Sequence, residues 1–176
     1  GLGAYRFEHY LAKTDMPRLH SEGHSAQALA MLDASVRIRD WINLPTEDMG
    51  PEHLQTAVFD AALAFNGKAE AIIGDDLLIH NLPTIHAVGR ASHRAPRLLR
   101  LDWGDATHPH VVLCGKGVCF DTGGLDIKSA EGMRHMKKDM GGAAHALGLA
   151  RMIMQCRLPV RLTLLIPAVE NSIAGN

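Results

Sequence analysis

Hydrophobic residues recur at helical spacing early in the chain. Between residues 25 and 42, Leu29, Leu32 and Val36 recur every three or four positions, and the charged residues at 37, 39 and 40 are left for solvent. Because the residue before a proline is pushed away from helical angles, Pro45 ends this helix. The pattern therefore predicts a helix with one apolar face over residues 25–42.

The elements that follow alternate between helices and short strands. Proline favours a first helical turn, so residues 50–66 are predicted to form a second helix, and a brief helix is expected after residue 74. Another helix is predicted from Gly141 to about residue 156, and the small residues at its start would let it pack closely on a sheet. Apolar runs predict strands at residues 69–73, 98–103, 110–114 and 160–168, with residues 118–120 extending the third after a kink at Gly117.

This order of elements predicts an α/β protein. We expect a three-layer α/β/α architecture with a mixed, mostly parallel central sheet that is incomplete in this chain. Residues 160–168 are nearly all apolar, as in a strand covered on both faces. Without the rest of the sheet, this strand is expected to expose an unpaired edge and to lower solubility. Residues 1–24 show no clear period and are interpreted as a lead-in or linker.

Composition narrows the class of protein. The chain is 47% hydrophobic and 21% charged, which is typical of a globular domain, and its formal charge of −1 gives no electrostatic reason to expect nucleic acid or a membrane surface. Its cysteines, Cys114, Cys119 and Cys156, are odd in number and form no Cys-x-x-Cys pair. They are interpreted as small packed residues in a reducing, cytoplasmic compartment.

One glycine-rich segment, residues 115–128, follows directly after the predicted strand at 110–114 and carries charged side chains. A phosphate-binding P-loop needs Gly, four residues and then Gly-Lys-Ser or Gly-Lys-Thr, which this segment does not supply. The dinucleotide pattern Gly-x-Gly-x-x-Gly fails as well, because Phe120 stands where the third glycine should be. Nucleotide binding is therefore disfavoured.

A metal site is the second interpretation of this segment. Asp121 follows a strand end and Asp139 precedes a helix, so the two carboxylates could meet at one cation. Lys116 could be a ligand only as a neutral amine, which burial and a nearby cation would favour. Lys128 could stay charged and stabilise an oxyanion. Spacing alone does not distinguish this site from a solvated turn with ordinary surface charges.

The segment also resembles a known family. Residues 115–124, 127–128 and 136–144 resemble, at matching spacings, the first metal-binding block of the leucyl aminopeptidase family, the cytosol aminopeptidases. Residues 39–45, 48–51 and 167–171 also resemble that family. The resemblance covers nearly the whole chain and is weakest over residues 1–24.

That resemblance implies an enzyme that releases N-terminal amino acids from peptides, with a leucine-type preference, using two divalent metal ions (zinc, manganese or magnesium). It implies that Lys116, Asp121 and Asp139 are metal ligands, with Asp121 bridging both ions. Asp139 would also bind the substrate's amino group. Lys128 would be catalytic and would bind and polarise the scissile carbonyl. Met136 would line the pocket for the first side chain.

The chain also departs from the family. The family's other ligands and an arginine lie in an Asn-Thr-Asp-Ala-Glu-Gly-Arg block that does not occur in this sequence. Residues 25–176 are therefore expected to form the N-terminal part of a catalytic domain, inactive alone and binding at most one metal ion weakly. The intact enzyme is expected to be a cytoplasmic homo-hexamer that acts on peptides. The alternative is a non-catalytic binding or assembly module.

Overall fold

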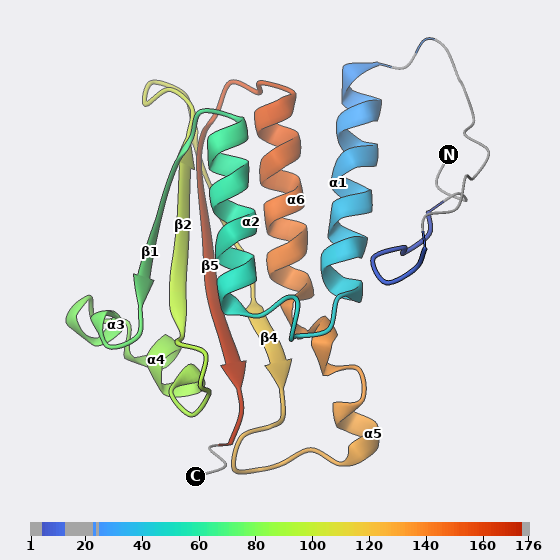
Figure 1. Cartoon of the computed structure of the whole chain (residues 1–176). Helices are drawn as coiled ribbons and strands as arrows, with labels where there is room; N and C mark the ends of the chain where they lie inside the picture. The colour runs from blue at the N-terminus through green and yellow to red at the C-terminus, as the bar shows by residue number, and fades with distance from the viewer. Residues whose placement is uncertain (1–4, 13–22, 24, 174–176) are drawn as a thin grey trace.

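Three long helices stand on one side of a sheet (Figure 1): α1 (Ala26–Asn43), α2 (Pro51–Ala64) and α6 (Gly141–Gln155). The computed structural model describes residues 5–12, 23 and 25–173. Ser25 caps α1, because its Oγ accepts a hydrogen bond of 3.1 Å from the Ala28 N–H. The helix ends just before Leu44-Pro45, as the sequence predicted.

The sheet has the strand order β1 (Lys68–Ile73), β2 (Arg97–Trp103), β5 (Arg161–Asn171) and β3 (His110–Cys114), and β4 (Gly117–Asp121) also pairs with β5. The β1–β2 and β2–β5 pairings are antiparallel, whereas the β3–β5 and β4–β5 pairings are parallel. The predicted mixed sheet is confirmed, but parallel pairings do not predominate within residues 25–173.

Strand β5 is central rather than exposed. It pairs with β2 over Leu162–Ala168, and with β3 and then β4 along its other edge. The expectation of an unpaired edge at residues 160–168 was therefore wrong, because the chain itself supplies neighbours on both sides. Among the elements that the structure describes, β1 and the β3–β4 pair form the outer edges of the sheet.

Strands β3 and β4 follow one another along β5, as the predicted extension implied. Gly115 and Lys116 interrupt them, and the Gly115 N–H donates to the Leu165 carbonyl at 3.0 Å. A bulge shifts the register of β4 between Val118 and Phe120. Asp121 consequently pairs with the last residue of β5, and this end of the sheet carries the predicted site.

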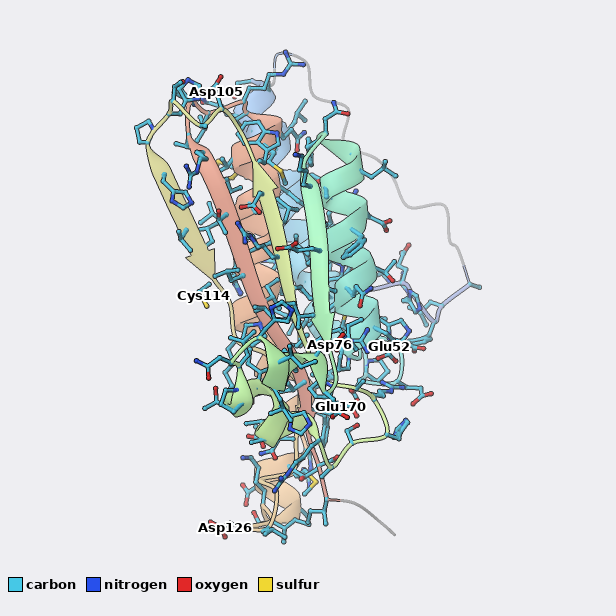
Figure 2. All side chains as sticks on the ribbon, turned by 90° about the vertical axis from the view of Figure 1, so that its left-hand side faces the viewer. Glu52, Asp76, Asp105, Cys114, Asp126 and Glu170 are labelled. Carbon is cyan, nitrogen blue, oxygen red and sulfur yellow. The ribbon has the colours of Figure 1, made fainter. Side chains whose placement is uncertain are left out.

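The core lies between the sheet and the long helices. Alternate residues of β2 and β5 face α2 and α6, and the fully buried ones include Leu99, Leu101, Leu162, Leu164 and Ile166. Short helices α3 (Asp76–Ile79) and α4 (Pro83–Gly89) cover only one end of the opposite face (Figure 2). The α/β class is thus confirmed, with a third layer that consists of these two short helices in the described chain.

Three short helices were not predicted. They are α4 and, near the predicted site, α5 (Ala130–Met133) and the 3-10 helix η2 (Met136–Met140). Each is too short for a hydrophobic period to show. The interpretation of residues 1–24 as a lead-in stays a prediction, since most of them lie outside the described residues.

Candidate metal centre

Lys116 lies in the break between β3 and β4, against the start of α6. Its carbonyl accepts a hydrogen bond of 2.9 Å from the Ala143 N–H. A Cβ on Gly115 would lie 2.7 Å from the Ala143 Cα, so only glycine permits this approach. The close backbone contact that the glycines suggested is therefore a contact with α6.

Asp139 comes to Lys116 from η2. The Asp139 Oδ2 lies 3.0 Å from the Lys116 Nζ, and the two side chains are 20% and 62% exposed. The two charges form an ion pair, but the contact is not a hydrogen bond, and the buried Oδ2 has no hydrogen-bond partner among the residues that the structure describes. Since Lys116 is largely solvated, the burial that ligation by a neutral amine was expected to use is absent here.

Asp121 is held by a different set of donors at the end of β4. Its Oδ2 accepts from Lys128 Nζ at 2.8 Å, and its Oδ1 accepts from the Gly123 N–H at 2.9 Å and from Asn171 Nδ2 at 2.7 Å. Burial alone would raise the pKa of Asp121, but these hydrogen bonds together hold that pKa below its ordinary value. The carboxylate is therefore kept ionised.

The structure thus joins the predicted residues two by two, Lys116 with Asp139 and Asp121 with Lys128. Within the described part of the chain, no three acidic, histidine or cysteine side chains converge as a ready cation cage. The donor set nevertheless fits a hard divalent cation, because it offers carboxylate oxygens. One of those oxygens, Asp139 Oδ2, is buried and lacks the hydrogen bond that such an atom normally has.

Met136 opens η2 and is half-buried, three residues before Asp139. Its side chain therefore belongs to the same short element as the proposed ligand. Ser129 begins the preceding short helix, where its Oγ accepts from the Gly132 N–H at 3.2 Å. The α5–η2 segment thus carries the residue expected to contact a substrate side chain.

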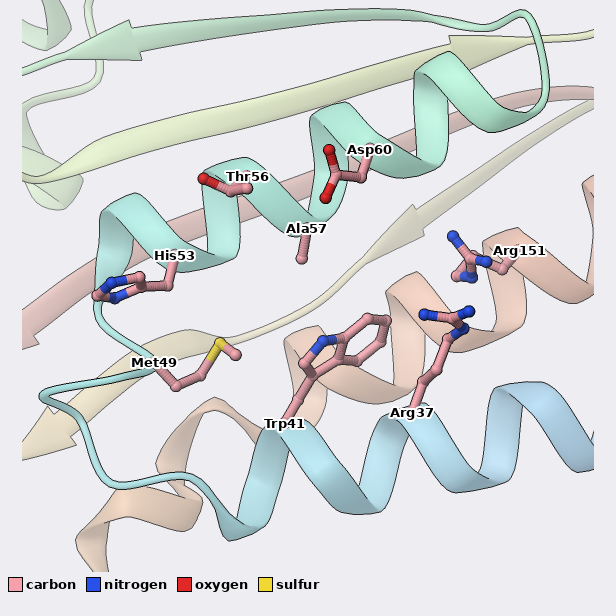
Figure 3. A pocket seen from close by; sticks show the side chains of 8 residues that line it. All are labelled: Arg37, Trp41, Met49, His53, Thr56, Ala57, Asp60 and Arg151. Carbon is pink, nitrogen blue, oxygen red and sulfur yellow. The ribbon is translucent and has the colours of Figure 1, made fainter. Parts of the chain in front are cut away.

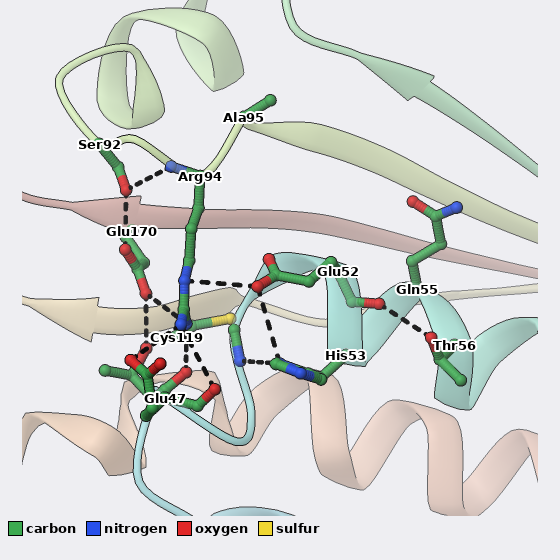
Figure 4. Close-up of polar contacts among 12 residues, drawn as sticks. Glu47, Glu52, His53, Gln55, Thr56, Ser92, Arg94, Ala95, Cys119 and Glu170 are labelled. Atoms are coloured by element: carbon green, nitrogen blue, oxygen red, sulfur yellow. Dashed lines mark hydrogen bonds and ion pairs between the residues drawn. The ribbon is translucent and has the colours of Figure 1, made fainter.

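A buried polar network, which the sequence did not predict, lies beside the site (Figure 4). Glu170 is 7% exposed and accepts hydrogen bonds from Thr46 Oγ1 at 2.7 Å, Ser92 Oγ at 2.7 Å and Arg94 Nη1 at 3.2 Å. The network connects the loop after α1 and the loop before β2 to the C-terminal end of β5. It thereby fixes the strand residue that precedes Asn171.

Arg94 is the cation at the centre of this network. Besides Glu170, it contacts Glu47 at 3.0 Å, Glu52 at 3.3 Å and the Thr46 carbonyl. Its side chain is only 10% exposed, so these carboxylates and the carbonyl offset the cost of burying its charge. The arrangement is an internal ion-pair cluster with a structural role.

A cavity of about 250 Å³ lies away from the predicted residues, between α1, α2 and α6 (Figure 3). Its charged lining residues are Arg37, Arg151 and Asp60, and the Arg37 Nε donates to both carboxylate oxygens of Asp33, at 2.9 and 3.0 Å. Burial and the nearby Arg37 lower the pKa of Arg151. Because two carboxylates offset the two guanidinium charges, this cavity has no net attraction for an ion.

The predicted packing role of the cysteines is confirmed for Cys119 but is wrong for the exposed Cys114. Cys119 is buried, and its pKa is raised strongly by burial and by the nearby Glu170 carboxylate, so it is an inert thiol. Cys156 is partly buried and Cys114 is exposed, and all three are free. Within the ranges that the structure covers, no helix is long and apolar enough to cross a membrane.

Comparison with known proteins identifies the family of this chain. The sequence model of the cytosol aminopeptidase family, catalytic domain, matches residues 36–176. The chain belongs to the cytosol aminopeptidase family. Peptidase B from Pectobacterium carotovorum subsp. carotovorum is 41% identical over 148 residues, which are 79% of this chain and 34% of that protein.

Solved structures of the family share the fold. The cytosol aminopeptidase from Coxiella burnetii matches with a TM-score of 0.92 and 53% identity over 99% of this chain and 38% of that one. The bottromycin maturation enzyme BotP, solved in complex with Mn, matches with a TM-score of 0.87 and 31% identity over 99% of this chain and 38% of that one. The chain thus spans little more than a third of the length of the family members it matches.

Proposed function

We propose that this chain is the metal-binding part of a metal-dependent aminopeptidase that releases N-terminal amino acids from peptides, with a leucine-type preference. The observation that carries the proposal is the buried Asp139 Oδ2, which lacks a hydrogen bond and faces Lys116. The likeness to BotP, which was solved in complex with Mn, supports dependence on a divalent cation. Manganese, zinc and magnesium all suit carboxylate ligands.

Three residues would hold the cation: Lys116, Asp121 and Asp139, with Asp121 shared between two ions. Bound cations would activate a water molecule and polarise the scissile carbonyl. Asp139 would also accept the substrate's terminal ammonium group, which restricts the reaction to the first residue of a peptide. Lys116 binds a cation only after its ammonium group has given up a proton, because only the neutral amine has a lone pair.

Lys128 would donate to the oxyanion that develops on the scissile carbonyl. It is partly exposed and already lies at the end of β4, where its ammonium group donates to Asp121 at 2.8 Å. When a substrate binds, the Lys128 ammonium group would donate to the substrate oxygen in place of Asp121. Met136, at the start of η2, would line the pocket for the first side chain of the peptide.

We further infer that the 176-residue chain alone is inactive, since the sequence contains no Asn-Thr-Asp-Ala-Glu-Gly-Arg block. The loss of several members of one catalytic constellation removes most of the rate enhancement. The intact enzyme would be a cytoplasmic homo-hexamer, and residues 25–176 would form the N-terminal part of its catalytic domain after a lead-in at 1–24.

A chimera tests this proposal. The aligned part of the Coxiella burnetii cytosol aminopeptidase is replaced by this chain, and release of leucine from short peptides is measured with Mn²⁺ present. We expect a folded, active chimera, and loss of activity in the Lys128→Ala version at an unchanged melting temperature. A folded but inactive chimera that binds no Mn²⁺ would instead favour the binding or assembly module.

A further inference from the structure

We propose that Asn171, the last residue of β5, is a positioning residue that orients the Asp121 carboxylate for cation binding; the inference rests on the proposed function. Nothing in the sequence motif assigns Asn171 such a role. Its amide Nδ2 donates to the Asp121 Oδ1 at 2.7 Å, which is the shortest of the three hydrogen bonds that this carboxylate accepts.

The hydrogen bonds on Asp121 are unequal, and this inequality points to a function. Oδ1 accepts from both Asn171 and the Gly123 N–H, whereas Oδ2 accepts, among the described residues, only from the Lys128 Nζ. A carboxylate oxygen accepts about two hydrogen bonds, so Oδ1 is saturated and Oδ2 keeps acceptor capacity. Asn171 and Gly123 therefore fix the plane of the carboxylate and leave Oδ2 to a cation.

The fold brings these two side chains together through the bulge in β4. Asp121 pairs with Asn171 only because Cys119 is an extra residue between Val118 and Phe120. In a regular ladder continuing from the Val118–Val169 pair, Cys119 would pair with Glu170 and Phe120 would stand opposite Asn171. Bulges commonly re-aim one side chain beside a functional site, and here the re-aimed side chain is a proposed metal ligand.

The position of Asn171 is itself fixed. Thr122 binds the Asn171 carbonyl twice, through its N–H and its Oγ1, both at 2.9 Å. The preceding residue, Glu170, is held by the Arg94 network. The amide therefore projects from a backbone that is anchored on both sides, as a residue that orients a ligand requires.

The chemistry of an amide suits this role better than that of a charged donor. Lys128 also donates to Asp121, but its positive charge opposes the approach of a cation. Asn171 donates a hydrogen bond of similar length without adding charge. It can therefore remain on Asp121 when a cation binds, whereas Lys128 is free to turn to the substrate.

The test is titration of the 176-residue chain with Mn²⁺ by calorimetry, with Asn171→Leu and the control Thr122→Val. Asn171→Leu keeps the side-chain volume and removes only the amide. Thr122→Val removes the Oγ1 hydrogen bonds to the Asn171 carbonyl at 2.9 Å and from the Gly124 N–H at 3.2 Å, and it removes none of the three hydrogen bonds that Asp121 accepts. Loss of a residue that orients a metal ligand typically weakens affinity about 10- to 100-fold. We expect that loss in Asn171→Leu alone, with melting temperatures within about 4 °C of the wild type for both variants.

Equal weakening by Asn171→Leu and Thr122→Val would overturn the proposal, because Asn171 would then act only by closing the strand end. Unchanged Mn²⁺ affinity in Asn171→Leu would overturn it as well. If the wild type binds no Mn²⁺, the metal site of the proposed function is lost for this chain. NMR then decides about Asn171: its side-chain amide protons should shift in Asp121→Ala without metal, and an identical amide signal would reject the contact.

Discussion

Glu170 is a buried carboxylate and Asp139 a partly buried one near the same end of the sheet, yet the two are held in opposite ways. Glu170 accepts three hydrogen bonds from side chains, one of them from Arg94. Asp139 has a buried oxygen with no hydrogen bond and a single lysine nearby. The backbone around Asp139 is instead fixed by close packing of Gly115 and Lys116 on the start of α6.

This difference suggests a structural role for Glu170 and a ligand-binding role for Asp139. A buried carboxylate that is paired with side-chain donors, one of them a cation, contributes to the stability of the fold. A carboxylate that lacks donors costs free energy in the metal-free chain, and a cation would remove that cost. The chain therefore uses side-chain partners to hold Glu170, whereas backbone packing holds the region of Asp139 and its Oδ2 has no hydrogen bond among the described residues.

The largest expected effect comes from breaking the Glu170 network. Arg94→Ala leaves Glu170 and Glu52 without their buried cation, which should lower the free energy of unfolding by about 3–5 kcal/mol. Urea denaturation measures this loss. Arg100→Ala is the control, because Arg100 pairs with Glu70 and Asp102 at the surface and should cost at most about 1 kcal/mol. Equal losses would mean that Glu170 is not held by its buried partners.

A smaller effect is expected where packing holds Asp139. Gly115→Ala would place a Cβ 2.7 Å from the Ala143 Cα, a backbone atom that cannot turn away. Such overpacking costs about 1–3 kcal/mol, and thermal unfolding would report it. Gly132→Ala is the matched control, since its Cβ would meet nothing closer than 3.4 Å. If both substitutions are tolerated equally, close packing does not fix the Asp139 region.

The smallest effect concerns Asp102, whose carboxylate is paired with Thr163 and Arg100. Burial alone would raise its pKa, but hydrogen bonds from Thr163 at 2.7 Å and from Arg100 hold that pKa below its ordinary value of 3.8. A lowered folded-state pKa stabilises the fold above the ordinary value, and this contribution is lost as the pH falls through the folded-state value. In urea denaturation, Asp102→Asn should therefore flatten the loss of stability that begins at about pH 5 and continues as the pH falls below the ordinary pKa of 3.8. An unchanged slope would show that Asp102 gains nothing from its partners.

Much of the fold could be predicted from local signals. The Ser25 cap and Pro45 bounded α1, and apolar runs located the strands to within a few residues. The balance of parallel and antiparallel pairings was not predictable, because strand direction depends on which distant strands meet. The central place of β5 was missed for the same reason: its neighbours β2 and β3 lie about 50 or more residues earlier in the chain.

The candidate site was less accessible from spacing. The short helix α5 separates the elements that carry Asp121 and Asp139, so their positions suggested a metal site but could not distinguish it from a solvated turn. The contact of Asn171 with Asp121 depends on one extra residue at Cys119. A simple alternation of apolar and polar residues does not reveal such a bulge.

The most direct test of the central claim is calorimetric titration of the 176-residue chain and its Asp139→Asn variant with Mn²⁺, together with their urea denaturation without metal. We predict measurable binding by the wild type and a loss of affinity of at least about 10-fold in the variant, since removal of a ligand should cost no less than removal of a residue that orients one. Without metal, the variant should be at least as stable as the wild type, because it removes a buried charge that lacks a hydrogen bond. Identical titrations of the two chains would contradict the account.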